Sequence, residues 1–482
     1  MNGGNFLMSK VSVKKATMIN GIAKYSNAIT NIIFTAVLAR ILSPKDFGVI
    51  AIVGVFISFF STLSDMGLGT SIIQNKELNR KDISSIFGFS MYIAFSLALI
   101  FCILSIPISI FYHDKVYIGI CAILSITIIF DSLNMVPSAI LMREKKFVVI
   151  GIRMIVVNIT TGIFTIFLAI MGAKYYALVF QSVISSAITF IWNYSSTKPE
   201  LLIRYDKNVI KKIKSYSGFH FAFSVINYFA RNTDNLLIGK FMGGSELAYY
   251  DKGYKLMLYP VGYLTNVITP ILHPILSDYQ NDKKYIYEQY MKVVRILSIL
   301  GVFISLFCFF FSKEIIVIMF GDQWENSIQC FRILSLSVWA QMICSSTGSI
   351  FLSIGNSKLM FISGTISAVE TIIMIAIGLC FGSLPVLCVF ITIAYNVSFF
   401  INYFFLLRYG FKSGLWNFFG SFIPDIIVGC IILITMSSIH INLSNQYILF
   451  FIKVFICIGA YIVGLFITKR YKVFTNLLKR RK

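Results

Sequence analysis

Polar side chains recur at helical spacing inside stretches of the chain that are otherwise apolar. Asn20, Lys24, Asn27 and Asn31 are separated by four, three and four residues, which places them along one face of a helix. Ammonium and amide groups arranged in such a row can donate hydrogen bonds to an anion and exchange them with hydroxyl groups. The row therefore predicts a surface that binds a polar, negatively charged ligand.

The same pattern occurs twice more along the chain. Asn227 and Arg231 lie four residues apart in a second row, and Lys255 and Asn266 belong to a third. A charge in the middle of a membrane helix costs about 2.5 kcal/mol or more if it faces lipid, so we expect such side chains to face an internal cavity. Together with two further cations within apolar stretches, the candidate ligand-binding residues are Asn20, Lys24, Asn27, Asn31, Arg153, Asn227, Arg231, Lys255, Asn266 and Arg332.

Five acidic residues lie within or beside apolar stretches and could each bind a proton or a cation: Asp65, Asp131, Asp234, Glu370 and Asp425. Of these, Asp65, Asp234 and Glu370 are the candidates for coupling to an ion. Each is equally consistent with a structural counter-ion, and Asp234 follows Arg231 by three residues, a spacing that permits an ion pair within one helix. Isolated amides such as Asn134 and Asn158 are predicted to join helices to each other. The four histidines are scattered, so no metal site is expected.

The elements that must position these residues are membrane helices. Of the 482 residues, 57% are hydrophobic and 13% are charged, and several runs of about 20 residues or more contain no Asp, Glu, Lys or Arg. A net charge of +22 would indicate nucleic acid in a soluble chain, but no soluble domain is predicted to carry a basic face. The nine cysteines show no CxxC spacing, and no nucleotide-binding or hydrolase motif occurs.

The apolar runs predict an all-α membrane protein with about 14 transmembrane helices. Most of the 42 basic residues fall in alternate connections and in the two ends of the chain. Because Lys and Arg beside membrane spans remain in the cytoplasm, both termini are predicted to be cytoplasmic.

An internal repeat divides the predicted spans. A shift of 200 residues aligns Asn27 with Asn227 and Asn31 with Arg231, and a shift of 210 aligns Gly172 with Gly382. These matches predict two pseudo-symmetric six-helix lobes with the same orientation, followed by two C-terminal helices. The predicted boundaries are 1–198 for the N-terminal lobe, 199–410 for the C-terminal lobe, and 411–482 for the last two helices and a basic tail.

Short motifs between the predicted helices resemble those of bacterial polysaccharide-export flippases. This Wzx-type family belongs to the superfamily of multidrug, oligosaccharidyl-lipid and polysaccharide exporters. Leu38–Gly48 resembles the family's LARxLxPxDFG segment, and the other similar segments are Asp65–Gln74, Asp234–Tyr250, Pro274–Ser277 and Phe320–Trp324. The likeness extends to about Tyr409, and beyond it the chain matches only in the number and hydrophobicity of its helices.

The resemblance implies a flippase, not an enzyme, in the bacterial cytoplasmic membrane. Its expected substrate is an oligosaccharide linked to undecaprenyl diphosphate, a precursor of O-antigen and lipopolysaccharide, of capsule or of a related polymer. The expected mechanism is alternating access of a basic cavity, with a proton or sodium gradient as the candidate energy source and no cofactor. Membrane lipids, a polysaccharide polymerase and a chain-length regulator are the expected partners, and nucleic acid is not.

Two other functions remain open at this point. A multidrug or cation antiporter of the same fold would need an acidic cavity, whereas the polar rows are basic and rich in amides. A membrane-embedded polysaccharide polymerase would need a sizeable loop domain, and the predicted connections are short.

If the polar rows line the substrate path, Lys24→Ala and Arg231→Ala should each reduce surface polysaccharide more than Lys115→Ala, which removes a cation from a predicted loop. The measurement is surface polymer in cells with matched amounts of each variant. Equal polymer in all three would contradict the cavity assignment.

Overall fold

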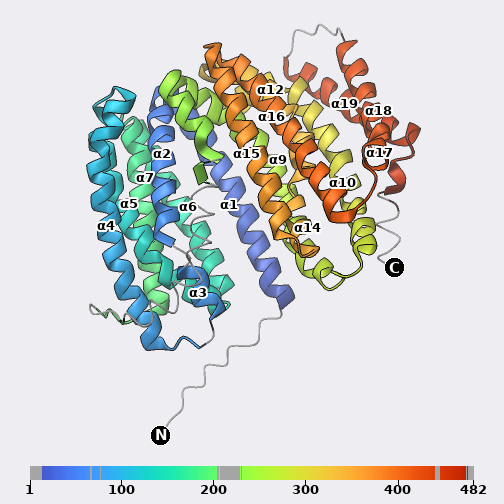
Figure 1. Cartoon of the computed structure of the whole chain (residues 1–482). Helices are drawn as coiled ribbons and strands as arrows, with labels where there is room; N and C mark the ends of the chain where they lie inside the picture. Colours follow the sequence, from blue (N-terminus) through green and yellow to red (C-terminus); the bar gives the residue numbers. More distant parts are fainter. Residues whose placement is uncertain are drawn as a thin grey trace. The chain divides into compact units, whose positions relative to one another are not determined.

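The computed structural model describes residues 13–65, 68–75, 77–202, 206, 228–229, 231–439, 446–473 and 475. Helices account for nearly all of these residues, and no strand occurs among them. The chain forms two compact units, Met1–Leu247 and Ala248–Lys482. An all-helical fold was predicted, and the helices confirm it (Figure 1).

The first unit is a bundle in which long helices pack in pairs. Helix α5 contacts α2, α4 and α7, while α1 packs on α6 (Figure 1). A further helix covers residues 231–241, and α9, Gly244–Ser277, begins in this unit. The other helices are α1 Val13–Ile41, α2 Pro44–Asp65, α3 Leu68–Gln74, α4 Arg80–Tyr112, α5 Val116–Arg143, α6 Phe147–Ile170 and α7 Tyr175–Thr197.

The second unit contains the rest of α9 and the helices that follow it. Helix α10 packs on α12, α13 and α18, α15 packs on α16, and α18 packs on α19. A 3₁₀ turn covers Asp322–Trp324, and a π-helical turn covers Leu406–Phe411. The helices are α10 Lys283–Phe310, α11 Ser312–Phe320, α12 Glu325–Ser335, α13 Val338–Cys344, α14 Thr347–Ser353, α15 Ser357–Cys380, α16 Leu384–Phe405, α17 Leu415–Gly420, α18 Ile423–Ser437 and α19 Gln446–Ile467.

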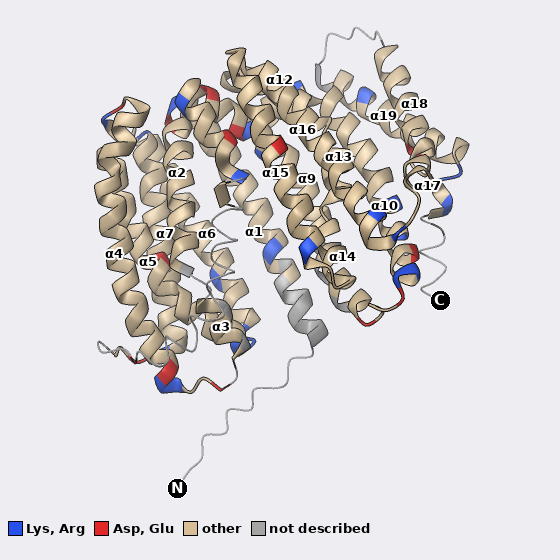
Figure 2. Cartoon of the chain, in the orientation of Figure 1, with Lys and Arg blue, Asp and Glu red and all other residues tan. Residues whose placement is uncertain are grey.

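The outer surface of the helices is apolar, as membrane spans require. On α4 the side chains of Phe95, Leu99, Ile103 and Ile110 follow one another at intervals of four, four and seven residues, which places them on one face of the helix. These side chains are 55–67% exposed. Figure 2 shows α4 free of charged residues over most of its length. A continuous exposed apolar face of this kind suits lipid rather than water.

Over the described residues, 10 helices are long and apolar enough to span a membrane, or 11 if the bent pair Asp322–Ser335 and Val338–Ser353 forms one span. The three other predicted spans correspond to α1, to α9 and to a region near Asn227 that lies outside the described residues. Helices α1 and α9 contain 29 and 34 residues, which is long enough to span, but they carry the polar rows. The count of 14 therefore stays a prediction, as do the lobe boundaries at residues 198 and 410.

The motif at the start of α2 is explained by the way that this helix begins. The Ser43 hydroxyl donates to Asp46 Oδ2 at 2.6 Å, and the backbone N–H groups of Ser43 and Asp46 bond to each other's side chains. This is a capping box, with Pro44 in the first turn where its missing N–H costs nothing. A Cβ on Gly48 would lie 2.0 Å from the backbone oxygen of Gly244, so the motif glycine permits α2 and α9 to meet.

Two glycines that the predicted repeat aligns have the same local role. Gly172 follows α6 with φ of 84°, and Gly382 follows α15 with φ of 63°. Both lie in the tight turn that joins a helix to its antiparallel neighbour, α6 to α7 and α15 to α16. Left-handed backbone at this position favours glycine, which accounts for the match.

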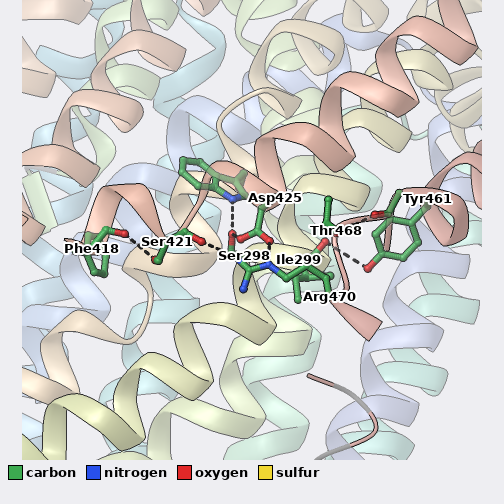
Figure 3. Close-up of polar contacts among 10 residues, drawn as sticks. Ser298, Ile299, Phe418, Ser421, Asp425, Tyr461, Thr468 and Arg470 are labelled. Atoms are coloured by element: carbon green, nitrogen blue, oxygen red, sulfur yellow. Dashed lines mark hydrogen bonds and ion pairs between the residues drawn. The ribbon is translucent and has the colours of Figure 1, made fainter. Parts of the chain in front are cut away.

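A buried ion pair joins the last two helices to the rest of the second unit. Arg470, in the turn after α19, contacts Asp425 of α18 at 2.7 Å, with the two side chains 11% and 1% exposed. Ser298 of α10 donates to the same carboxylate at 2.6 Å and accepts from the Trp339 indole at 3.0 Å (Figure 3). Arg470 also donates to the carbonyl of Ser421, so this cluster connects α10, α13, α18 and the end of α19.

Removal of one partner should destabilise the protein, because it leaves the other charge buried and unpaired. We expect Asp425→Ala to lower the free energy of unfolding by about 3–5 kcal/mol, measured by thermal unfolding of the purified protein. The double variant Asp425→Ala, Arg470→Met should recover part of this loss. A single variant as stable as the wild type, or a double variant no more stable than the single, would contradict the structural role.

Candidate functional site

A cavity of about 270 Å³ lies in the first unit between α1, α6 and α7. It brings together three of the residues predicted to bind a ligand: Asn27 and Asn31 of α1 and Arg153 of α6. Most of its lining is polar. The lining residues are Asn27, Asn31, Arg153, Met154, Val157, Asn158, Thr161, Gln181, Ser185 and Thr189.

Helix α1 is attached to α6 beside this cavity by a pair of amides. Asn158 Nδ2 donates to Asn27 Oδ1 at 2.7 Å and to the backbone oxygen of Asn27 at 3.2 Å. Asn158 was predicted to join helices, and these hydrogen bonds confirm it. The same contact fixes the Asn27 side chain at the cavity wall.

Arg153 is held in the cavity by a relay of amides across three helices. Its Nη1 donates to Asn193 Oδ1 on α7 at 2.7 Å, and Asn193 Nδ2 donates to Asn134 Oδ1 on α5 at 2.7 Å. Asn193 is fully buried. An arginine carries five N–H donors, so a bond to Asn193 leaves donors for a ligand in the cavity.

The cavity therefore combines one fixed cation with neutral amides and hydroxyls. Among the described residues that line it, Arg153 is the only one with a charged side chain. Guanidinium groups bind phosphate oxygens in a bidentate, charge-assisted manner, while Asn and Gln donate to and accept from hydroxyl groups. The chemistry of the lining suits an anionic ligand that also carries hydroxyls.

The other residues of the first two polar rows are only partly described. Lys24 on α1 and Arg231 on the helix over 231–241 are exposed. Asn227 lies outside the described residues, as does the side chain of Asn20. Two of the four positions in the α1 row therefore reach the cavity in this structure, Asn27 and Asn31.

Lys255 and Arg332, predicted for the same purpose, lie in the second unit and make local contacts there. Lys255 forms an ion pair with Asp251 one turn earlier on α9, at 2.7 Å. Arg332 Nε donates to Ser312 Oγ at 3.0 Å. The side chain of Asn266 lies outside the described part. A role of these residues in ligand binding stays a prediction.

The predicted ion-coupling acids lie in different surroundings. Asp234 is buried, and its Oδ1 accepts from the backbone N–H of Asn235 at 2.8 Å. Glu370 accepts from Ser398 at 3.3 Å beside a cavity of about 340 Å³ with mostly apolar walls. The Asp65 side chain lies outside the described residues. Within the described part, no three His, Cys, Asp or Glu side chains form a group that could hold a metal.

Sequence reasoning missed the contribution of α7. Gln181, Ser185 and Thr189 line the cavity at intervals of four residues, and Asn193 continues the same spacing. This row is a helical stripe like that of α1, and its spacing was visible in the sequence. It contains no charged residue, and a charge within an apolar span is the signal that distinguishes the other rows.

Comparisons with known proteins show the family of this chain and proteins of similar fold. A family model described as "Polysaccharide biosynthesis protein" matches residues 37–329. An uncharacterized membrane protein in the cps region of Klebsiella pneumoniae is 20% identical over 95% of this chain and 96% of its own length. The lipopolysaccharide biosynthesis protein WzxC of Escherichia coli (strain K12) is 23% identical over 69% of both chains.

The fold is similar to that of a solved lipid flippase. The lipid II flippase MurJ, in an inward closed conformation, superposes with a TM-score of 0.71 over 95% of this chain and 100% of its own. The two sequences are 17% identical, so the likeness concerns the fold alone.

The relay predicts a measurable stability effect. Asn193→Ala removes the acceptor for Arg153 and the donor to Asn134, and it leaves both inside the bundle without that partner. We expect a loss of about 1–3 kcal/mol in the free energy of unfolding, seen as a lower melting temperature of the purified protein. Asn417→Ala, which removes an exposed amide from α17, is the matched control. Equal melting temperatures for the two variants would show that the relay does not stabilise the bundle.

Proposed function

The chain belongs to the polysaccharide biosynthesis protein family, and from this premise we propose that it is a flippase for an undecaprenyl-diphosphate-linked oligosaccharide. The substrate would move from the cytoplasmic to the outer leaflet of the bacterial cytoplasmic membrane, for O-antigen, capsule or a related surface polysaccharide. The motifs at Leu38–Gly48 and Phe320–Trp324, the multi-pass apolar helices and the MurJ-like fold support this function.

The observation that carries the proposal is the position of Arg153 in an amide-lined cavity. A lipid-linked diphosphate brings at least one negative charge and many hydroxyl groups into the membrane. Arg153 would bind diphosphate oxygens, while Asn27, Asn31 and Gln181 would exchange hydrogen bonds with the first sugars. Charge-assisted bonds are stronger where the local dielectric is low than they are at the protein surface.

The cavity opposes a function in exporting cationic drugs. A cation-selective site needs a carboxylate to neutralise the ligand, and the one charged residue among the lining residues is Arg153. The same lining contains no nucleophile with a positioned base, so it does not favour glycan transfer. We therefore propose a carrier rather than an antiporter for cationic drugs or a polymerase.

The proposed mechanism is alternating access by two lobes. In this proposal the chain has 14 membrane helices, arranged as two six-helix lobes and a C-terminal pair, with both termini in the cytoplasm. Rocking of the lobes would expose the bound diphosphate to each side in turn, driven by a proton or sodium gradient. Lys24, Arg231, Lys255 and Arg332 would attract the anionic headgroup along its path. A polymerase and a chain-length regulator would act on the exported product.

Removal of the Arg153 charge should impair transport more than removal of a charge outside the cavity. We expect Arg153→Ala to slow translocation of undecaprenyl-diphosphate-linked oligosaccharide in proteoliposomes by about tenfold or more, as expected for the loss of a charge-assisted bond. Arg153→Lys keeps the charge without the bidentate geometry, so its translocation rate should lie between those of the wild type and Arg153→Ala.

Lys115→Ala is the control for loss of a cation, because Lys115 is exposed outside the cavity. Elution of each variant as a single species in detergent separates transport defects from misfolding. Wild-type rates in Arg153→Ala would contradict the proposed binding site, and the absence of translocation by the wild-type protein would contradict the function.

A further inference from the structure

A second cavity in the first unit lies apart from the substrate cavity and has one carboxylate among its described lining residues. It has a volume of about 360 Å³ and lies between α2, α3 and α5. Among its lining residues is Asp131, whose carboxylate lies in the middle of α5. The lining residues are Ser61, Ser64, Gly69, Ile73, Asp131, Asn134, Met135, Ser138, Ala139 and Met142.

One hydroxyl contacts the carboxylate, and further side-chain oxygens lie in the wall of the same cavity. Ser61 Oγ on α2 donates to Asp131 Oδ2 at 3.0 Å. Ser64, one turn along α2, shares a hydrogen bond of 2.6 Å with Ser132 of α5. Asn134 and Ser138 add an amide and a hydroxyl to the same wall. Carboxylate, hydroxyl and amide oxygens are the ligands that hard cations prefer.

No Lys or Arg occurs among the described residues that line this cavity. An ionised carboxylate within a helix bundle is costly, so such a group either takes up a proton or is accompanied by a positive charge. A small cation, together with some of its hydration water, would supply that charge, and a cavity of about 360 Å³ has room for it.

Asp131 is the one carboxylate among the described residues that line the cavity, and a single carboxylate favours a monovalent ion. Calcium takes six to eight oxygen ligands and typically several carboxylates, and the described residues contain no group of three acidic or other metal-binding side chains. One negative charge with several neutral oxygens matches one positive charge.

The cavity is connected to Arg153 through the relay already described. Asn134 lies three residues after Asp131 on α5, and its Oδ1 accepts from Asn193, which in turn accepts from Arg153. An amide oxygen has two lone pairs, so Asn134 can accept from Asn193 and still ligate a cation. A cation beside Asn134 would therefore act on the groups that hold Arg153 in the substrate cavity.

We propose that the cavity around Asp131 binds a small monovalent cation and that Asn134 and Asn193 couple this site to Arg153. The first half is independent of the transported molecule. The second half rests on the proposed function, because it links the cation to the residue that binds the diphosphate. Coupling between two sites is reciprocal, so the cation must change diphosphate affinity by the same factor as the diphosphate changes cation affinity.

The test of the first half is binding of ²²Na⁺ to the purified full-length protein in nanodiscs. We expect saturable binding by the wild type and a reduction of about tenfold or more in affinity for Asp131→Asn, which keeps the shape and removes the charge. Asp278→Asn, in the exposed connection between α9 and α10, should bind sodium as the wild type does. No saturable binding, or equal binding by Asp131→Asn, overturns the cation site. If sodium does not bind and Asp131 instead releases a proton when the pH is raised, the carboxylate holds a proton, and this result also overturns the cation site.

The test of the coupling is the dissociation constant of undecaprenyl diphosphate with sodium and with an impermeant organic cation at equal ionic strength. Sodium should shift this constant at least about threefold in the wild type and leave it unchanged in Asp131→Asn. An unchanged constant in the wild type overturns the coupling. If sodium binds but undecaprenyl diphosphate does not, the proposed function fails and the cation site stands. If undecaprenyl diphosphate binds but sodium does not, the cation site fails and the proposed function stands.

Discussion

The hydrogen bond from Arg153 to Asn193 is the interaction on which the arrangement of the first unit depends. Arg153 lies in the second turn of α6, and a guanidinium within a membrane helix that faces lipid is costly, so a polar partner inside the bundle favours the inward direction. Asn193 supplies that partner from α7 and is itself satisfied by Asn134 of α5. One buried amide thus aligns three helices and places a positive charge inside the bundle.

The rest of the site follows from that alignment. With Arg153 directed inwards, the polar row of α7 and the amides Asn27 and Asn31 of α1 line the same cavity. Asn158 of α6 bonds to Asn27 and so joins α1 to α6. Apolar side chains then occupy the outward faces, as Phe95 and Ile103 do on α4. In the second unit a buried polar contact also connects helices, but the pair of Asp425 and Arg470 lines none of the described cavities.

The fold class and part of the site could be predicted from the sequence, because both depend on local patterns. Apolar runs predicted the long helices. The row on α1 predicted residues that bind a ligand, and Asn27 and Asn31 of that row line the cavity between α1, α6 and α7, while their role in binding stays a prediction. The row from Asn20 to Asn31 covers 12 residues, or about 16 Å of helix, so one small cavity cannot contact all of it. This is why Lys24 is exposed while Asn27 lines the cavity.

What could not be predicted is which distant residues become partners. Arg470 belongs by sequence to a basic tail, yet it pairs with Asp425, 45 residues earlier. Asn193 and Asn134 are separated by 59 residues, and nothing in their local sequence indicates that they meet. Such pairs depend on how helices pack, which hydropathy and spacing along one helix do not determine.

The central claim is that the α1–α6–α7 cavity binds the diphosphate of a lipid-linked glycan. Photo-crosslinking tests it most directly, with undecaprenyl diphosphate that carries a diazirine beside the diphosphate and with mass spectrometry of the labelled peptides. The account predicts labels on the peptides that contain Asn27, Arg153 and Gln181, with competition by unlabelled undecaprenyl diphosphate. Labels confined to lipid-facing residues such as Phe95 and Ile103, or labels that no competitor displaces, would contradict it.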